Sequence, residues 1–119
     1  MTPTRLSIRI DLPGGGRIGP GKIALLEAIR TAGSISAAAR TLGMSYRRAW
    51  LLVEEVNRQL RSPAVTTEAG GRHGGGAALT RAGEQVVDLY HAIEAHAHTA
   101  ARSEFRALGR LVRREAVSA

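Results

Sequence analysis

Residues 35–52, with the sequence ISAAARTLGMSYRRAWLL, constrain the fold of this chain more than any other stretch. The pattern predicts a short helix, a tight turn and a second helix. Three consecutive alanines keep the first helix slim, and Gly43 stands at its end, where a left-handed conformation costs glycine little. We expect Ser36 to cap the first helix and Ser45 the second. This is the pattern of a helix-turn-helix; the alternative is an ordinary helical corner in a small core. The second helix has apolar positions at helical spacing, namely Ala49, Leu52, Val53, Val56 and Leu60.

Positive charge gathers on the same stretch. The chain has 17 Lys and Arg against 10 Asp and Glu, a net charge of +7. No acidic residue stands between Glu27 and Glu54, whereas four arginines do, namely Arg30, Arg40, Arg47 and Arg48. Charge of one sign at a helix start favours a polyphosphate partner, and arginine pairs bidentately with guanine O6 and N7. The alternative is that these arginines only solubilise the surface.

The residues before this motif predict a strand and a helix. Residues 6–12 alternate apolar and polar side chains, as a half-buried strand does. The glycine-rich loop that follows lacks a phosphate-binding pattern and is expected to be a plain turn. Residues 22–32 form a helix with one apolar side, which Gly33 ends. Trp50, the sole tryptophan, borders the apolar stripe of its helix and is expected in the core rather than against a base.

A glycine-rich hairpin is expected after the motif. Residues 64–68 and 77–80 are predicted strands around AGGRHGGG, in which Arg72 and His73 are the only large side chains. We expect Arg72 to reach a minor groove or a phosphate; the alternative is a surface hairpin with incidental charges. The order of elements is that of a winged helix, so residues 1–80 are the expected DNA-binding head. The expected DNA-binding residues are Ser34, Ser36, Ser45, Tyr46, Arg47, Arg48, Leu51, Arg72 and His73.

Residues 81–119 are expected to form a long dimerisation helix within the same domain. Thr80 is placed to cap this helix, with Glu84 in its first turn. No proline interrupts residues 81–116, and a single helix of about 36 residues is about 54 Å long, too long for the head to cover. A monomer would leave its apolar stripe in water, which predicts a homodimer. A membrane-surface helix is disfavoured because its polar side mixes both charges. The stripe consists of Val86, Tyr90, Ile93, Ala97, Ala101, Phe105, Leu108 and Val112.

Composition argues against several other classes of protein. Cysteine is absent, so no thiolate metal site is available. His91 and His98 share a helix face but stand about 10 Å apart, too far for one ion, and we expect no metal; the alternative is a site built across a dimer. No arrangement of nucleophile, base and acid suggests an enzyme. No apolar run reaches membrane-spanning length and the first residues lack a signal-peptide core, so we expect a cytoplasmic protein without a membrane partner.

Three stretches also carry a family resemblance, namely GSISAAARTLGMSYRRAW from Gly33, GGRHGGG from Gly70 and LTRAGEQVVDLY from Leu79. They resemble the N-terminal DNA-binding domain of ModE, the molybdate-responsive bacterial regulator with a LysR-type helix-turn-helix. The resemblance extends over roughly residues 22–112. It implies a mainly α fold with a small β part, a winged helix-turn-helix followed by a long C-terminal dimerisation helix. It also implies a dimeric repressor or activator at promoters of molybdenum transport and use.

ModE proteins usually continue into a pair of molybdate-binding domains, whereas this chain stops at Ala119. We therefore expect no cofactor, and in particular no tight molybdate binding, within these residues. The expected function is sequence-specific binding of double-stranded DNA by a homodimer, and a heterodimer with a longer ModE-like protein is left open. The alternative function is a protein-interaction module, in which the basic head docks an acidic partner and the long helix scaffolds assembly.

Overall fold

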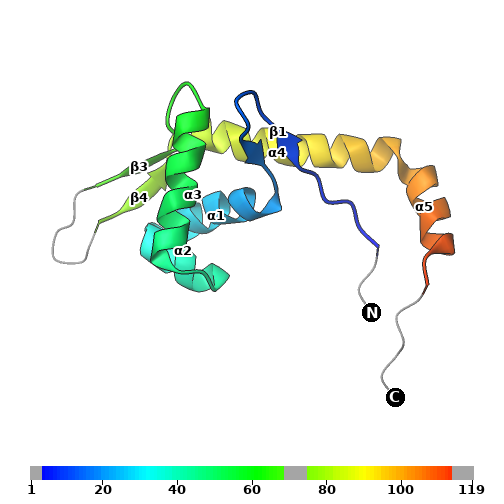
Figure 1. Ribbon diagram of the computed structural model, residues 1–119, viewed down its shortest axis with the longest axis horizontal. Coiled ribbons are helices and arrows are strands. Elements are labelled where there is room, and N and C mark those ends of the chain that lie inside the picture. The colour runs from blue at the N-terminus through cyan, green and yellow to red at the C-terminus, as the bar shows by residue number, and fades with distance from the viewer. Residues whose placement is uncertain (1–3, 69–74, 114–119) are drawn as a thin grey trace, which may run out of the picture.

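The computed structural model describes residues 4–68 and 75–113. Three helices form a compact head, the hairpin β3–β4 projects from one side of it, and α4 runs across it and beyond (Figure 1). This arrangement confirms the mainly α winged helix-turn-helix with a long helix after it. The elements are β1 (Ile10–Asp11), β2 (Arg17–Ile18), α1 (Pro20–Ala32), α2 (Ile35–Leu42), α3 (Tyr46–Gln59), β3 (Val65–Thr67), β4 (Ala77–Leu79), α4 (Arg81–Ala100) and α5 (Arg102–Leu111).

The turn between α1 and α2 places the N-cap of α2 two residues earlier than expected. Gly33 ends α1 with a φ of 77°, in the left-handed region. Ser34 is then extended, and its hydroxyl accepts a hydrogen bond of 3.0 Å from the N–H of Ala37. The prediction that Ser36 caps this helix is wrong, because the glycine stop leaves Ser34 as the first residue outside α2. Ser36 lies within the helix and is exposed.

The turn between α2 and α3 agrees with the sequence pattern. Gly43 has a φ of 67° and its N–H donates to the carbonyl of Arg40 at 3.2 Å. Ser45 caps α3, since its hydroxyl accepts from the N–H of Arg48 at 3.1 Å. The predicted apolar stripe of α3 faces the core. Its fully buried members are Ala49, Val53 and Val56, and Leu52 and Leu60 pack at the edge.

The core of the head is aliphatic and tight. Leu25, Leu26 and Ile29 of α1 are fully buried, and the small side chains of Ala38 and Ala39 let α2 lie close against its neighbours. Val87 of α4 completes the core from the far side. Burial of apolar area at about 25 cal/mol per Å² is the dominant stabilising contribution in such a core.

The wing, defined here as β3, β4 and the residues between them, is tied to the head by four hydrogen bonds. β3 and β4 pair antiparallel, with Val65 opposite Leu79. Asn57 of α3 accepts from the N–H groups of Ala64 and Val65 at 2.8 and 3.1 Å and donates to the carbonyl of Val65 at 3.1 Å. The N–H of Ala77 donates to the carbonyl of Gly33 at 2.8 Å. The wing is therefore tied to α3 and to the α1–α2 turn.

The N-terminal residues form a shorter strand than expected. Only Ile10–Asp11 pairs, and it pairs with β2, which the sequence reading missed. A tight turn joins the two strands, closed by a hydrogen bond of 2.7 Å from the N–H of Leu12 to the carbonyl of Gly16. Upstream, the carbonyl of Ile8 accepts a hydrogen bond of 2.7 Å from the hydroxyl of Tyr90. The alternating segment thus packs partly on α4 instead of in a longer sheet.

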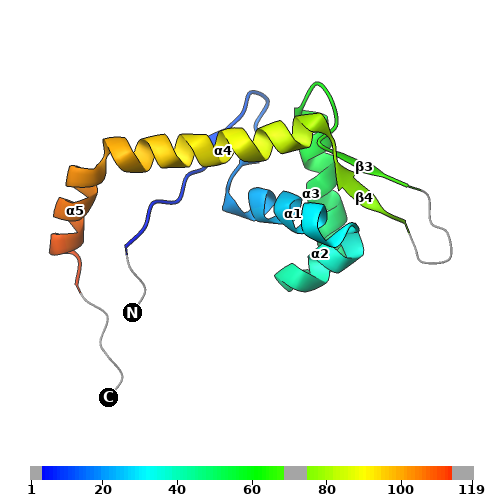
Figure 2. The same ribbon diagram turned by 180° about the vertical axis from the view of Figure 1, so that it is seen from behind.

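The long helix is broken near its far end. α4 stops at Ala100, Ala101 has a ψ of 16°, and α5 then runs in a different direction (Figure 2). The prediction of one helix through residue 116 is wrong, because α5 ends at Leu111. Neither proline nor glycine stands at the bend, and the rings of His98 and Phe105 contact each other across it. Within residues 4–68 and 75–113, no helix is long and apolar enough to cross a membrane.

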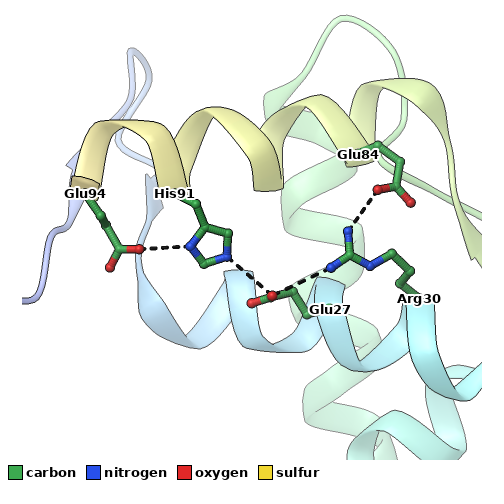
Figure 3. Close-up of polar contacts among 5 residues, drawn as sticks. All are labelled: Glu27, Arg30, Glu84, His91 and Glu94. Atoms are coloured by element: carbon green, nitrogen blue, oxygen red, sulfur yellow. Dashed lines mark hydrogen bonds and ion pairs between the residues drawn. The ribbon is translucent and has the colours of Figure 1, made fainter. Parts of the chain in front are cut away.

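A polar joint of five residues fixes the direction of α4 against α1 (Figure 3). The Arg30 guanidinium contacts Glu84 at 2.9 Å and Glu27 at 3.7 Å. The two ring nitrogens of His91 face Glu27 at 3.3 Å and Glu94 at 3.0 Å. The hydrogen bond to Glu94 and then the contact with Glu27 raise the pKa of His91, while partial burial opposes them. Only an imidazolium can donate from both nitrogens, so the geometry suits the charged form.

Candidate nucleic-acid interface

The first two turns of α3 present a row of side chains that the core does not use. Tyr46, Arg47, Arg48, Trp50 and Leu51 are all exposed. At 3.6 residues per turn, Arg47 and Leu51 lie opposite the buried stripe of the helix, and Tyr46, Arg48 and Trp50 lie at its borders. The head therefore offers the start of α3 to a partner.

The arginines on this surface differ in their availability. Arg47 and Arg48 take part in none of the ion pairs found among the described residues, and neither does Arg40 of α2. Arg30, in contrast, is held by Glu27 and Glu84 in the polar joint. Three of the four arginines noted in the sequence can thus meet phosphate or base edges, and the fourth is structural.

A pocket of about 600 Å³ opens between the start of α2, the start of α3 and the ends of β3 and β4 that lie next to their connecting residues. Trp50 lines it and is 41% exposed, so the expectation that Trp50 lies in the core is wrong. Tyr46 precedes Trp50 by one helical turn and lines the same pocket. The lining residues are Ser34, Ile35, Ser36, Arg40, Tyr46, Trp50, Thr67, Glu68, Gly75, Gly76 and Ala77.

The predicted DNA-binding residues fall into three groups in the structure. Ser34, Ser36 and Tyr46 meet in the pocket. Arg47, Arg48 and Leu51 are exposed on α3, and the Ser45 hydroxyl is engaged in its cap. Arg72 and His73 of the wing lie outside the described residues.

The sequence analysis did not predict the other pocket residues as site residues, and Arg40, Trp50 and Thr67 are examples. For Trp50 the signal was present, because it follows Tyr46 by four residues and so shares its helix face. Arg40 was counted only as part of the local charge. Thr67 could not be found, because its place depends on how the wing folds back beside α2.

The predicted dimer stripe is divided between the core of the protomer and its surface. Tyr90 is only 3% exposed and is bonded to Ile8, so it serves the protomer itself, and Val86 packs against the same core. Ile93, Leu108 and Val112 are exposed; Ala97, Ala101 and Phe105 are half-buried. Leu89, at 63% exposed, and Leu111 belong to the unpartnered apolar surface although the predicted stripe omitted them.

Two of the three histidines of α4 make side-chain contacts within the protomer. His91 is held between two glutamates, and His98 packs against Phe105. Among residues 4–68 and 75–113, no group of His, Asp and Glu side chains is arranged to hold a metal ion.

The fold and the exposed start of α3 define a class of protein, and the comparison with known families agrees. Residues 21–84 match the family of bacterial regulatory helix-turn-helix proteins of the lysR type, and the chain belongs to that family. The matched residues extend from α1 to the first turn of α4. The family is one of regulatory proteins.

Within that family, the chain is similar to ModE and Mop proteins. It is 53% identical over 81 residues to the molybdenum-pterin-binding protein MopB of Rhodobacter capsulatus, covering 68% of this chain and 30% of the relative. It is 41% identical over 96 residues to the molybdenum transport protein ModE of Azotobacter vinelandii, covering 79% and 36%. It is 42% identical over 71 residues to the DNA-binding transcriptional dual regulator ModE of Escherichia coli K12, covering 60% and 27%.

These matches confirm the resemblance to the ModE DNA-binding domain. They also set its extent, because the chain spans about a third of the length of these relatives.

Proposed function

We propose that this protein binds double-stranded DNA in a sequence-specific manner and regulates transcription. The observation that carries the proposal is the start of α3, where exposed Arg47, Arg48 and Leu51 stand on a rigidly capped helix beside a wing. A helix of this kind fits the major groove, and its first turn is the part that reaches base edges. Arginine supplies bidentate contacts to guanine, and Leu51 an apolar contact to a thymine methyl group.

The proposed regulator acts as a homodimer. The outer side of α4 exposes Leu89 and Ile93, and α5 exposes Leu108, Leu111 and Val112. Exposure of these apolar side chains to water is unfavourable, and a second copy of the chain would cover them. A two-fold dimer reads two half-sites in opposite orientation, so the operator is expected to be an inverted repeat. A heterodimer with a longer ModE-like chain would use the same surface.

The genes controlled are proposed to serve molybdenum transport or use. This step comes from the names of the relatives, among them a molybdenum transport protein and transcriptional regulators ModE. The direction of control, repression or activation, depends on where the operator lies in a promoter.

Selection from a random duplex pool tests the function. Purified protein at physiological salt should recover a reproducible inverted repeat, whereas salt-dependent binding to random DNA would reflect only the basic charge. Recovery of no motif would favour the competing function, a basic head that docks an acidic protein partner.

Variants of the arginines test the site. Arg47→Ala or Arg48→Ala should cost about 1–3 kcal/mol of binding and relax the preference at one base pair. Arg72→Ala, in the glycine-rich stretch of the sequence between β3 and β4, should weaken binding to all sequences alike and flatten the salt slope by about 0.9 per phosphate contact. If neither α3 variant changed the selected motif or its affinity, the assignment of α3 to the groove would be wrong.

A further inference from the structure

The pocket beside Trp50 lies where a strand of DNA would have to pass. A recognition helix in the major groove and a wing at the adjacent minor groove are separated by one sugar–phosphate backbone. The pocket opens between these two elements, with the start of α2 as its third wall. Bound DNA in this orientation would press a backbone segment against the pocket.

The chemistry of the α2 wall suits a phosphate. Arg40 and Ser36 are exposed there, and neither takes part in an ion pair or a side-chain hydrogen bond among the described contacts. The first N–H groups of a helix have no partner within the helix. Ser34 satisfies that of Ala37, which leaves those of Ile35 and Ser36 at the positive end of α2.

The α3 wall suits a sugar. Trp50 presents a partly exposed indole and Tyr46 an exposed phenol, on successive turns of one helix. A deoxyribose ring is apolar on its face, so it packs on an aromatic ring as apolar groups generally do. Aromatic and cationic walls meet in one pocket.

We propose that this pocket binds a single backbone nucleotide of the strand that separates the two grooves. In it Arg40 and the start of α2 hold the phosphodiester, and Trp50 packs against the deoxyribose. This assignment rests on the proposed DNA binding and deepens it, since it makes Trp50 and Arg40 binding residues that position the strand without reading a base.

Glu68 makes the proposal more specific. Its side chain belongs to the wing wall of the same pocket. A carboxylate repels a phosphate, so the phosphate must lie toward α2, and Glu68 weakens the complex. Glu68→Gln should therefore tighten binding to every sequence, about twofold to fivefold at low salt, and the gain should shrink as salt screens the repulsion.

The decisive experiment replaces one phosphate at a time with a neutral methylphosphonate along the selected operator. For the wild type, one position in each half-site should lose about tenfold in affinity, as expected for a charge-assisted contact. Arg40→Ala should bind the unmodified operator about tenfold more weakly, and the same methylphosphonate should then cost nothing further. Arg17→Ala, which removes an exposed arginine on β2, is the matched control and should keep the full sensitivity.

Trp50 provides a second and independent readout. As the only tryptophan it reports the pocket directly, so its fluorescence should change when the operator binds, and less when the sensitive phosphate is a methylphosphonate. Trp50→Leu should weaken the operator without altering the selected motif, after circular dichroism has shown an unchanged fold.

The outcomes separate this proposal from the function on which it rests. Failure of the wild type to select any motif would overturn both. A selected motif whose methylphosphonate sensitivity is the same in wild type and Arg40→Ala, with unchanged tryptophan emission, would overturn the pocket alone. Loss of sensitivity in Arg40→Ala but not in Arg17→Ala supports it.

Discussion

Gly83, in the first turn of α4, sets how closely that helix approaches the loop before the wing. A Cβ built on Gly83 would lie 2.2 Å from the carbonyl oxygen of Ala64 and 3.1 Å from its carbonyl carbon. The same carbonyl oxygen accepts from the N–H of Thr80 at 2.9 Å, and the Thr80 hydroxyl donates to Pro63 at 2.6 Å. The start of α4 is therefore pinned to backbone that has little room to move.

Gly83→Ala should consequently lower the free energy of unfolding by about 2 kcal/mol or more, since over-packing against backbone forces a shift. Gly21→Ala is the matched control, because a Cβ there meets nothing within 4 Å and the position is helical. This control substitution should raise the free energy of unfolding by about 0.5–1 kcal/mol, because alanine favours the helix more than glycine does. Urea unfolding followed by circular dichroism measures both. Equal effects of the two substitutions would contradict the close approach.

At the scale of elements, the polar joint between α1 and α4 makes their packing depend on pH. His91 is approached by Glu27 from α1 and by Glu94 from α4, and Arg30 and Glu84 are the next charges along the same seam. The pKa of His91 is raised in the folded protein, chiefly by Glu94. The stabilisation from this group is therefore complete below the unfolded value of about 6.5 and disappears as pH rises through the higher folded value.

His91→Gln should remove this pH dependence. Because the imidazole is half exposed, the effect is on the order of 0.5 kcal/mol. The wild type should be more stable than His91→Gln at pH 5.5 and nearly equal to it at pH 8.5, as measured by urea unfolding at matched ionic strength. His96→Gln, an exposed substitution on the same helix, serves as the control. If the free energies of unfolding of wild type and His91→Gln differed by the same amount at both pH values, the predicted role of His91 would be contradicted.

The outer face of α4 leads to a prediction about assembly. Ile93 is 45% exposed and sits one turn from Leu89. Ile93→Glu would bury an unpaired carboxylate in the proposed dimer and should raise its dissociation constant at least about tenfold. Thr99→Glu places the same charge on an exposed position away from the stripe and should leave the dimer intact. Sedimentation velocity distinguishes the two, and a monomeric wild type at micromolar concentration would contradict the dimer.

At the scale of the whole molecule, the local signals in the sequence predicted the architecture well. Gly43 and Ser45 act through neighbouring backbone, so their roles could be read from the chain and are confirmed. Ser36 was predicted to cap α2, whereas Ser34 caps it, because the cap of α2 follows the C-cap of α1 at Gly33 directly. Errors of this kind move an element's end without changing the fold.

The features that the sequence did not predict depend on distant contacts. Tyr90 is bonded to Ile8, more than eighty residues away, and Trp50 lines a pocket together with Thr67 and Ala77 of the wing. No proline or glycine stands at the bend at Ala101, so the sequence did not predict it. The exposed residues of α3 could thus be predicted from the sequence, whereas the residues that other elements bring to the pocket could not.

These 119 residues are expected not to bind molybdate tightly. A tetrahedral dianion needs several convergent donors in a closed site, whereas the pocket described here is open and carries Glu68 on one wall. Isothermal titration with molybdate and with sulfate should show equal, weak heats or none. Micromolar binding that prefers molybdate would contradict this expectation and place a sensor within this domain.

The hydrogen bond from Ala77 to Gly33 has a thermodynamic consequence for recognition. It joins β4 to the α1–α2 turn, while Asn57 joins the start of β3 to α3, so the spacing between α3 and the wing exists in the free protein. Association then need not organise the head, and its ordering entropy is correspondingly small. Calorimetry at several temperatures should give a heat-capacity change that scales with the contact area alone, without the larger negative value that accompanies coupled folding.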